Sequence, residues 1–147
     1  MTLQLREARP ADVPRLVEMG THFIATTQYR TKLATNVRAL AETMRRLIAI
    51  PQAVLIVAEY QGDLIGMLAV VAVEHPLSGE TTASEMFWWV EPAYRGRLGL
   101  YLLRAGEAWA QSRGATRIQM IAPDERVAKL YRRRGYSRLE EVYQRTL

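Results

Sequence analysis

Two periodicities of apolar and polar residues divide this chain into predicted elements. Residues 2–6 alternate as in a strand, whereas apolar positions within 13–26 and 37–48 recur with the spacing of helices that face a core. Pro51 cannot continue a helix, so the second helix is expected to end before it. Side chains able to cap these helices are Asp12 for the first and Thr35 or Asn36 for the second.

Three apolar runs in the middle of the chain predict strands. Residues 53–59 and 64–73 flank Gln61-Gly62-Asp63, which is typical of a tight hairpin turn. Residues 84–90 predict the third strand, and within it residues 86–90 are hydrophobic on both faces, as expected for a strand that is covered on both sides. We therefore expect two antiparallel strands followed by a buried central one.

The last third of the chain predicts four further elements. They are a helix from Leu98 that closes at Gly114, a strand over 116–121, a short helix from Asp124 to Gly135, and a final extended segment over 136–146. The whole order is strand, two helices, three strands, helix, strand, helix, strand. With no repeats or long linkers, it predicts a single mixed α/β domain spanning residues 1–147.

Composition excludes several classes of protein. The 147 residues are 49% hydrophobic and 24% charged, which is ordinary for a globular domain and too polar for a membrane span. The chain contains no cysteine, which excludes disulfides, thiolate metal sites and cysteine nucleophiles. Its first residues lack the apolar run of a signal peptide or membrane helix, so we expect a cytoplasmic protein without membrane contact.

Positive charge is concentrated in the second half of the chain. The net charge is +5, and residues 76–147 carry 12 basic against 8 acidic side chains. Such an excess indicates a nucleic-acid face, an anionic cofactor or a solvated surface.

Within this half, the strand ending at Val90 leads into a loop with two arginines and two glycines, and then into a helix. Free amides at a helix start bind phosphate, although a purely structural turn explains the same pattern equally well.

Two segments resemble the GNAT (GCN5-related) N-acetyltransferase family. Residues 92–96 read Pro-Ala-Tyr-Arg-Gly, like the loop that holds pyrophosphate in that family, and a leucine-rich helix follows. Residues 124–136 resemble its second signature, a short helix ending in Leu-Tyr before a glycine and an aromatic residue. The resemblance implies a mixed, mainly antiparallel sheet flanked by helices. The loop departs from the family in being one glycine short.

The resemblance also implies site residues for acetyl-coenzyme A (acetyl-CoA) as cosubstrate, without a metal. Main-chain groups of Trp88 and Val90 would pair with the pantetheine arm, while both indole rings of Trp88 and Trp89 are expected in the core. Tyr131 would protonate the departing thiolate, unless it is only a core tyrosine. Groups of the loop and helix start would hold the pyrophosphate, namely Arg95, Gly96, Arg97, Leu98, Gly99 and Leu100, with a larger share for Arg95 and Arg97 because of the missing glycine.

A proton acceptor for the attacking amine is harder to identify. Glu85 lies on the central strand, but it is five residues from Val90 and would face the opposite side unless a bulge intervenes. His75 and Glu80 are alternatives, and a solvated role is the plainer interpretation of each. Basic residues near the second signature could meet the 3′-phosphate or form a solvated face, namely Arg126, Lys129, Arg132, Arg133, Arg134 and Arg138.

The resemblance implies an amine as acceptor and does not specify which amine. Residues 26–30 and the loop around 75–82 would shape its specificity. A non-catalytic module of the same fold that binds nucleic acid or protein is an alternative, disfavoured by the presence of Tyr131; an acetyltransferase with a nucleic-acid-linked acceptor is another. Self-association as a homodimer is also left open, because the segment from Tyr136 onward could form an exposed edge that pairs between chains.

Overall fold

A five-stranded sheet organises the chain in the computed structural model, which describes residues 2–147. The strands follow one another in the order β1 (Gln4–Glu7), β2 (Ala53–Tyr60), β3 (Asp63–Glu74), β4 (Thr81–Val90) and β5 (Arg117–Gln119). Neighbours from β1 to β4 are antiparallel, and β5 runs parallel to β4. The sheet is therefore mixed and mainly antiparallel, as the family resemblance implied.

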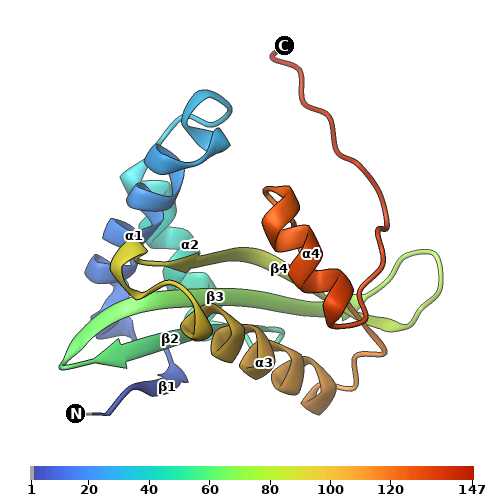
Figure 1. Cartoon of the computed structure of the whole chain (residues 1–147), viewed down its shortest axis with the longest axis horizontal. Helices are drawn as coiled ribbons and strands as arrows, with labels where there is room; N and C mark the ends of the chain where they lie inside the picture. The colour runs from blue at the N-terminus through green and yellow to red at the C-terminus, as the bar shows by residue number, and fades with distance from the viewer. Residues whose placement is uncertain (1) are drawn as a thin grey trace.

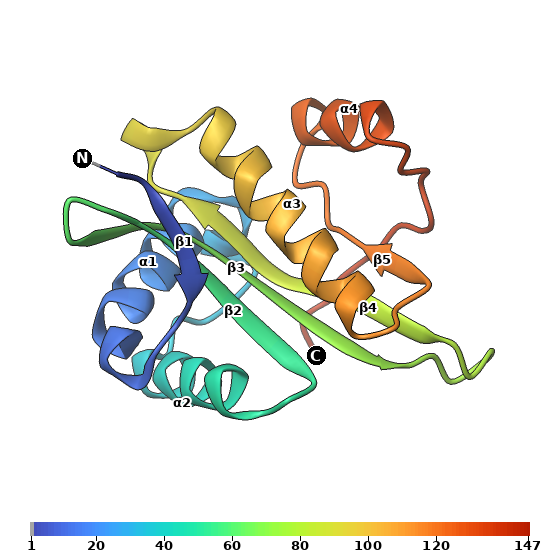
Figure 2. The same cartoon turned by 90° about the horizontal axis from the view of Figure 1, so that it is seen from below.

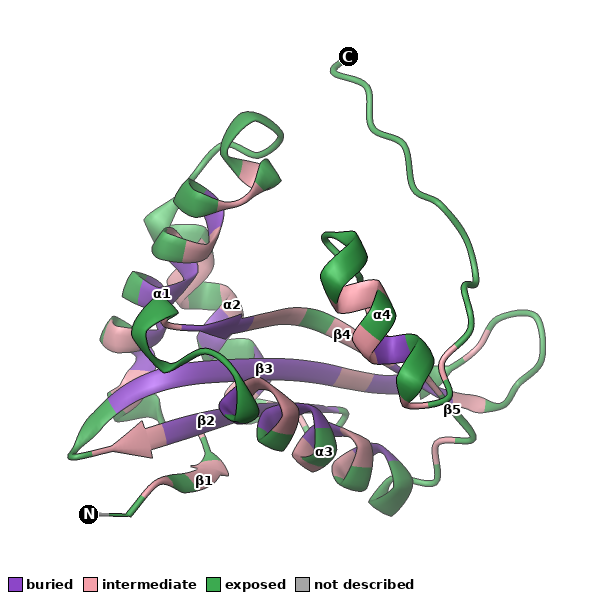
Figure 3. Ribbon diagram, in the orientation of Figure 1, coloured by how far each residue is buried: buried purple, intermediate pink, exposed green. Residues whose placement is uncertain are grey.

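Helices cover both faces of the sheet (Figures 1 and 2). The long helices are α1 (Val13–Thr26), α2 (Val37–Ala49), α3 (Arg97–Ser112) and α4 (Glu125–Arg133), with 3-10 turns η1 (Pro10–Asp12), η2 (Gln28–Thr31) and η3 (Pro92–Tyr94). One core cluster joins α1 and α2 to the sheet, and the other joins α3 to its opposite face. The two middle strands β2 and β3 are buried along most of their length (Figure 3), because both faces are covered.

Local signals predicted the turns and two of the caps. Gln61 and Gly62 have φ of 53° and 79°, the two positive values that a type I′ hairpin turn needs between β2 and β3. Asn36 Oδ1 accepts the Ala39 amide at 3.0 Å at the start of α2, and Asp124 Oδ1 accepts the Val127 amide at 3.0 Å at the start of α4. These predictions are confirmed, and Asn36 rather than Thr35 is the cap.

The prediction that the Asp12 side chain caps the first helix was wrong. Asp12 precedes α1, but its carboxylate makes no capping bond to that helix. It accepts the Arg9 amide at 2.7 Å and pairs with the Arg6 guanidinium at 2.8 Å instead. A charged partner on β1 therefore outcompetes the helix amides for this side chain.

The last predicted strand is absent. Residues 137–147 form no helix or strand in the structure, and β5 covers only Arg117–Gln119 rather than 116–121. A strand requires a neighbour that supplies hydrogen bonds, and none of the described strands lies beside the final segment, which leaves α4 as a single extended run (Figure 1). The prediction of a final strand was therefore wrong.

Candidate functional site

The sheet opens between β4 and β5. These strands pair only at Thr82, Ala83 and Ser84 of β4, opposite residues 117–119. Beyond Ser84 they diverge (Figure 2), and β4 continues to Val90 with no strand on its outer side among the described residues. The second half of β4 thus presents an unpaired main-chain edge in the middle of the molecule.

A β-bulge in β4 decides which side chains face this opening. Glu85 pairs with Val70 and Phe87 with Ala69, so Met86 has no partner on β3. The extra residue reverses the alternation, and Glu85 comes to line the same cavity as Trp88 and Val90. The bulge required by the sequence argument for Glu85 is therefore present.

The Tyr131 side chain lies directly beside Glu85. Its hydroxyl donates a hydrogen bond to the Ile121 carbonyl oxygen at 3.0 Å, and its side chain is buried, with 5% exposure. Its ring centroid is 6.1 Å from that of Trp88. Glu85 and Ile121 line the cavity, so the Tyr131 hydroxyl stands immediately behind its wall.

Burial changes the acidity of both groups. It raises the pKa of Glu85 to about 7, and contacts with the Ile121 main chain and the Tyr131 hydroxyl offset only part of the effect. Glu85 Oε1 is buried and has no hydrogen-bond partner within residues 2–147. Burial, followed by the nearby Glu85 charge, raises the pKa of Tyr131 far above its usual range. Tyr131 therefore remains protonated at neutral pH, whereas Glu85 changes charge there.

A polar network on α3 fixes the end of the Tyr131 helix. The Tyr136 ring packs on the Tyr131 ring with centroids 5.2 Å apart, and its hydroxyl donates to Glu107 at 3.0 Å. Arg134 pairs with the same Glu107 carboxylate. Because Glu107 belongs to α3, this network fixes α4, and with it Tyr131, against the helix that begins at the opening of the sheet.

The start of α3 offers free amides. Gly96 precedes the helix with φ of +121°, a conformation that residues other than glycine adopt only under strain, and no side chain caps the helix. The amides of Gly96, Arg97, Leu98 and Gly99 have no hydrogen-bond acceptor in the part of the chain that the structure describes. Together with the helix dipole, this arrangement suits an anion.

Glycine at position 99 also permits close packing of α3 on β4. A Cβ atom there would lie 3.2 Å from Cζ2 of the Trp88 ring, which is tighter than normal contact. The Leu98 side chain is buried in the core beneath the helix, while Leu100 lines the cavity. Leu98 thus anchors the helix in the core, while Gly96, Gly99 and Leu100 line the cavity.

Arg95 and Arg97 take different positions from each other. Arg95 Nε donates to the Val90 carbonyl oxygen at 3.1 Å, and its guanidinium lies 4.8 Å from the centroid of the Trp89 ring. Arg95 therefore lines the cavity but rests on the Trp89 side of β4, and it occupies the carbonyl expected to meet the pantetheine arm. Arg97 is exposed at the first turn of α3 and does not line the cavity.

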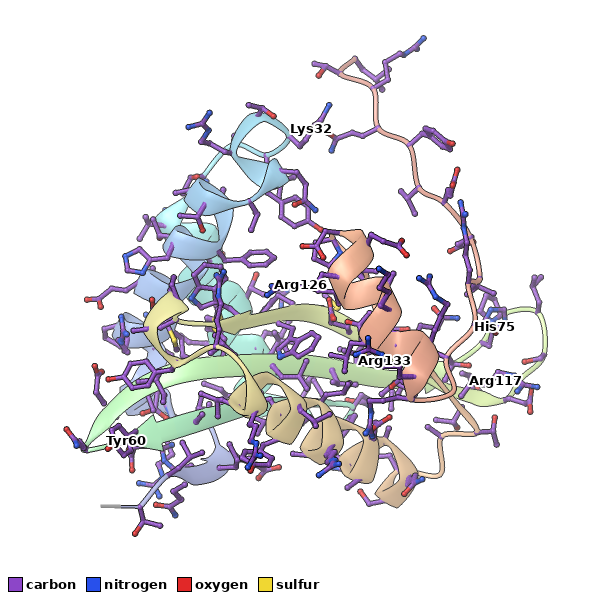
Figure 4. The ribbon with its side chains drawn as sticks, in the orientation of Figure 1. Lys32, Tyr60, His75, Arg117, Arg126 and Arg133 are labelled. Carbon is purple, nitrogen blue, oxygen red and sulfur yellow. The ribbon has the colours of Figure 1, made fainter. Side chains whose placement is uncertain are left out.

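These elements enclose a cavity of about 670 Å³. Its walls come from the end of β4, the start of α3, one side of α4, and the segment from α1 into η2. Arg126 and Arg133 line it from α4 (Figure 4), since residues seven apart share one side of a helix. Three other arginines of the basic cluster pair with acidic residues: Arg132 with Glu125, Arg134 with Glu107, and Arg138 with Glu141.

The wall opposite α4 was only partly anticipated. Thr26, Thr27, Gln28 and Tyr29 line the cavity, as the interpretation of residues 26–30 suggested, but Arg30 does not. Phe23 also lines it and makes an edge contact with Trp89, with ring centroids 5.8 Å apart. The helical spacing of Phe23 indicated only a core position, so its place in this wall could not be found from the sequence.

The alternative proton acceptors lie elsewhere. His75 is in the loop at the far end of the β3–β4 hairpin (Figure 4), where its Nδ1 accepts the Leu77 amide. Glu80 is in the same loop and contacts Thr116 and Arg117. Neither lines the cavity, so Glu85 is the candidate that the structure brings to Tyr131.

Two kinds of feature are absent from residues 2–147, namely a membrane-spanning helix and a cluster of metal ligands. No helix among residues 2–147 is long and apolar enough to cross a membrane. Over the same range, no group of three or more His, Cys, Asp or Glu side chains is arranged to hold a metal ion.

Solved structures share this fold over their whole length. A transcriptional regulator from Bacillus halodurans has a TM-score of 0.81 at 21% identity, covering 99% of this chain and 100% of its own. A predicted acetyltransferase with acetyl-CoA from Clostridium acetobutylicum has a TM-score of 0.81 at 17% identity, covering 99% and 96%. An aminoglycoside 6′-N-acetyltransferase from Acinetobacter haemolyticus has a TM-score of 0.74 at 19% identity, covering 98% and 97%. At these identities the likeness establishes the fold.

The sequence itself identifies the family. No curated protein sequence matches the chain. The model of the Acetyltransferase (GNAT) family matches residues 23–136, a range that includes the bulged strand β4, the uncapped start of α3 and the Tyr131 helix. This chain therefore belongs to the GNAT acetyltransferase family.

Proposed function

We propose that this protein transfers the acetyl group of acetyl-CoA to an amine, with Glu85 as proton acceptor and Tyr131 as proton donor. The observation that carries the proposal is the buried Glu85–Tyr131 pair beside the opening between β4 and β5. One group has its pKa raised to about 7, and the other stays protonated. Groups whose environments separate their acidities in this way suit acid and base roles in one reaction.

The residues present fit acetyl-CoA at three places. The unpaired edge of β4 can accept an extended amide-containing arm in the way that a sheet accepts another strand. The free amides at the start of α3 suit the pyrophosphate. Arg126 and Arg133 add positive charge on the facing side of the cavity, where no carboxylate pairs with them among the described residues.

Acetyl-CoA supplies an activated acyl group as a thioester, and the protein manages two protons. The ammonium form releases its first proton to solvent, so that the neutral amine attacks. Glu85 takes the second proton, which the nitrogen loses as its bond to the acyl carbon forms and the carbon–sulfur bond breaks. Tyr131 gives its hydroxyl proton to the departing sulfur. Because Glu85 and Tyr131 are adjacent, the proton held by Glu85 then restores the tyrosine hydroxyl, and both residues return to their starting states.

The acceptor enters, in this proposal, along α1 and η2. The lining there consists of aromatic and uncharged polar side chains, namely Phe23, Thr26, Thr27, Gln28 and Tyr29. The Thr26 and Thr27 hydroxyls donate to helix carbonyls. Within residues 2–147 the Thr26 oxygen is left free to accept, whereas the Thr27 oxygen already accepts the Tyr29 amide at 3.4 Å. This wall suits an amine with a neutral, aromatic or hydroxyl-bearing body, and Glu85 would supply the charge that attracts its ammonium form.

Calorimetric titration with acetyl-CoA tests the cofactor site. We expect affinity in the micromolar range, on the order of 8 kcal/mol. Arg126→Ala combined with Arg133→Ala should weaken binding, whereas Arg132→Ala should not, because Arg132 pairs with Glu125 on the exposed side of the same helix. No binding by the wild type would refute the enzymatic proposal and favour a binding module. Measured thiol release with a panel of amines then identifies the acceptor class.

A further inference from the structure

The final segment, residues 137–147, has unmet hydrogen-bonding capacity. None of its amides or carbonyls makes a hydrogen bond to another main-chain group within residues 2–147, and it contains no turn or bend. It also exposes large apolar side chains, with Leu139 at 68% and Tyr143 at 85% exposure. Extended backbone with free bonding groups and exposed apolar side chains is a template for pairing with another strand.

The sequence of this segment is symmetric along one face. Alternate residues of an extended chain share a face, and here they are Leu139, Glu141, Tyr143, Arg145 and Leu147. The Tyr143 hydroxyl donates to the Glu141 carboxylate, which shows that these two side chains lie on the same side. Read outward from Tyr143, the face has an acid on one side and a base on the other, followed in both directions by leucine.

We propose that this segment pairs, antiparallel, with the same segment of a second copy of the chain, about a two-fold axis through Tyr143. In that register Tyr143 lies opposite the partner's Tyr143. Glu141 lies opposite the partner's Arg145, and Leu139 lies opposite the partner's Leu147. Every pair on the face is then aromatic, oppositely charged or apolar, and each kind stabilises a sheet when directly opposed.

Competing registers lose these pairings. Residues that lie opposite each other across a two-fold axis must be on the same face of the strand. The nearest allowed alternatives therefore move each residue's partner by two positions along the strand. One of them places Glu141 opposite the partner's Tyr143, and the other places it opposite the partner's Leu147. Parallel pairing in register opposes Glu141 to its own copy, which is repulsive. The Tyr143-centred register alone matches all these side chains.

Dimer formation would break few contacts within the single chain. In one copy Glu141 also contacts Arg138, but both side chains are exposed, and such ion pairs contribute little stability. No residue of 137–147 lines the cavity described above. The dimer thus stands independently of the proposed acetyl transfer, and loss of one need not abolish the other.

Disulfide trapping in the full chain tests the register directly, because the sequence contains no cysteine. Tyr143→Cys places two thiols opposite each other, with Cα atoms about 5 Å apart, a distance that a disulfide spans. Leu139→Cys is the matched control, since its two copies would be roughly 27 Å apart along the strands. We expect a covalent dimer as the main oxidised species of Tyr143→Cys and a monomer for Leu139→Cys. Equal cross-linking of both variants would overturn the proposal.

A charge swap supplies a second test that keeps Tyr143. Glu141→Arg and Arg145→Glu each oppose like charges at two symmetric places and should each raise the dimer dissociation constant about tenfold or more. The double variant restores opposite charges and should restore dimerisation, as measured by analytical ultracentrifugation. A wild-type protein that is monomeric at all accessible concentrations, or a double variant no better than either single one, would refute the proposal.

Discussion

The hydroxyl of Tyr131 and the carboxylate of Glu85 lie side by side, one from α4 and one from the bulge of β4. The hydroxyl is held by the Ile121 carbonyl oxygen at 3.0 Å, and the Glu85 charge is one cause of the raised pKa of Tyr131. Burial raises the pKa of Glu85 by more than the contact with the Tyr131 hydroxyl lowers it, so the pKa of Glu85 remains raised. This relationship leads to the first three predictions.

The rate of acetyl transfer should increase with pH through neutrality. Glu85 accepts a proton only when ionised, and its pKa is about 7, so kcat should rise with an inflection near that pH. Glu85→Gln should remove the inflection and lower kcat by 10²- to 10⁴-fold, the usual contribution of such a group. The pH dependence of kcat is obtained from initial rates of thiol release at roughly pH 5.5 to 8.5, the range in which Glu85 titrates. An unchanged profile in Glu85→Gln would assign the base to another group.

The free energy of unfolding should fall as the pH rises from 4.5 to about 7, the ordinary and the raised pKa of Glu85. In the unfolded chain the carboxyl of Glu85 ionises at its ordinary pKa of 4.5, whereas in the fold it keeps its proton until about pH 7. The folded state therefore binds more protons between these values, and stability decreases as pH rises through them, by roughly 3 kcal/mol for this group. Urea unfolding at several pH values should show a smaller decrease for Glu85→Gln than for the wild type.

Removing the Tyr131 hydroxyl should affect turnover far more than binding. In Tyr131→Phe the ring contacts with Trp88 and Tyr136 remain, while the proton donor and the bond to Ile121 are lost. We expect kcat to fall by about 10²-fold or more with little change in acetyl-CoA affinity, and a stability loss of about 1 kcal/mol. A wild-type kcat in this variant would mean that Tyr131 is only a core residue.

Backbone strain introduced at the start of α3 should weaken the binding of acetyl-CoA. Gly96→Ala forces a side chain into φ of +121°, at a cost of about 1–3 kcal/mol, and shifts the amides that precede the helix. Gly79→Ala is the matched control, because Gly79 also has a positive φ, of 73°, but lies in the distant β3–β4 loop. Both variants should lower the melting temperature, and only Gly96→Ala should weaken acetyl-CoA binding by calorimetry. Equal affinities in the two variants would argue against the amide site.

Most elements could be predicted because their signals are local. The turn at Gly62, the cap at Asn36 and the cap at Asp124 depend on bonds within three residues, and the helical and strand periods depend on neighbouring side chains. The resemblance to the family rested on two short motifs, and the family match over 23–136 confirms it. Where the prediction of a cap failed, the partner lay in a different element of the fold. Asp12 is bonded to Arg6 on β1, which no capping rule takes into account.

The sequence by itself determined the order of helices and strands as far as α4, the family, and the presence of Tyr131 on a short helix after β5. The tertiary structure decided that β4 carries a bulge at Met86, which turns Glu85 toward Tyr131, and that β4 and β5 separate after Ser84 to leave an open edge. It also decided that Arg95 lies on Trp89, and that the last extended segment finds no strand partner among residues 2–147. The physical reason is the same in each case. Periodicity and caps depend on nearby residues, whereas register, bulges and strand partners depend on which backbone groups compete for each other across the folded chain.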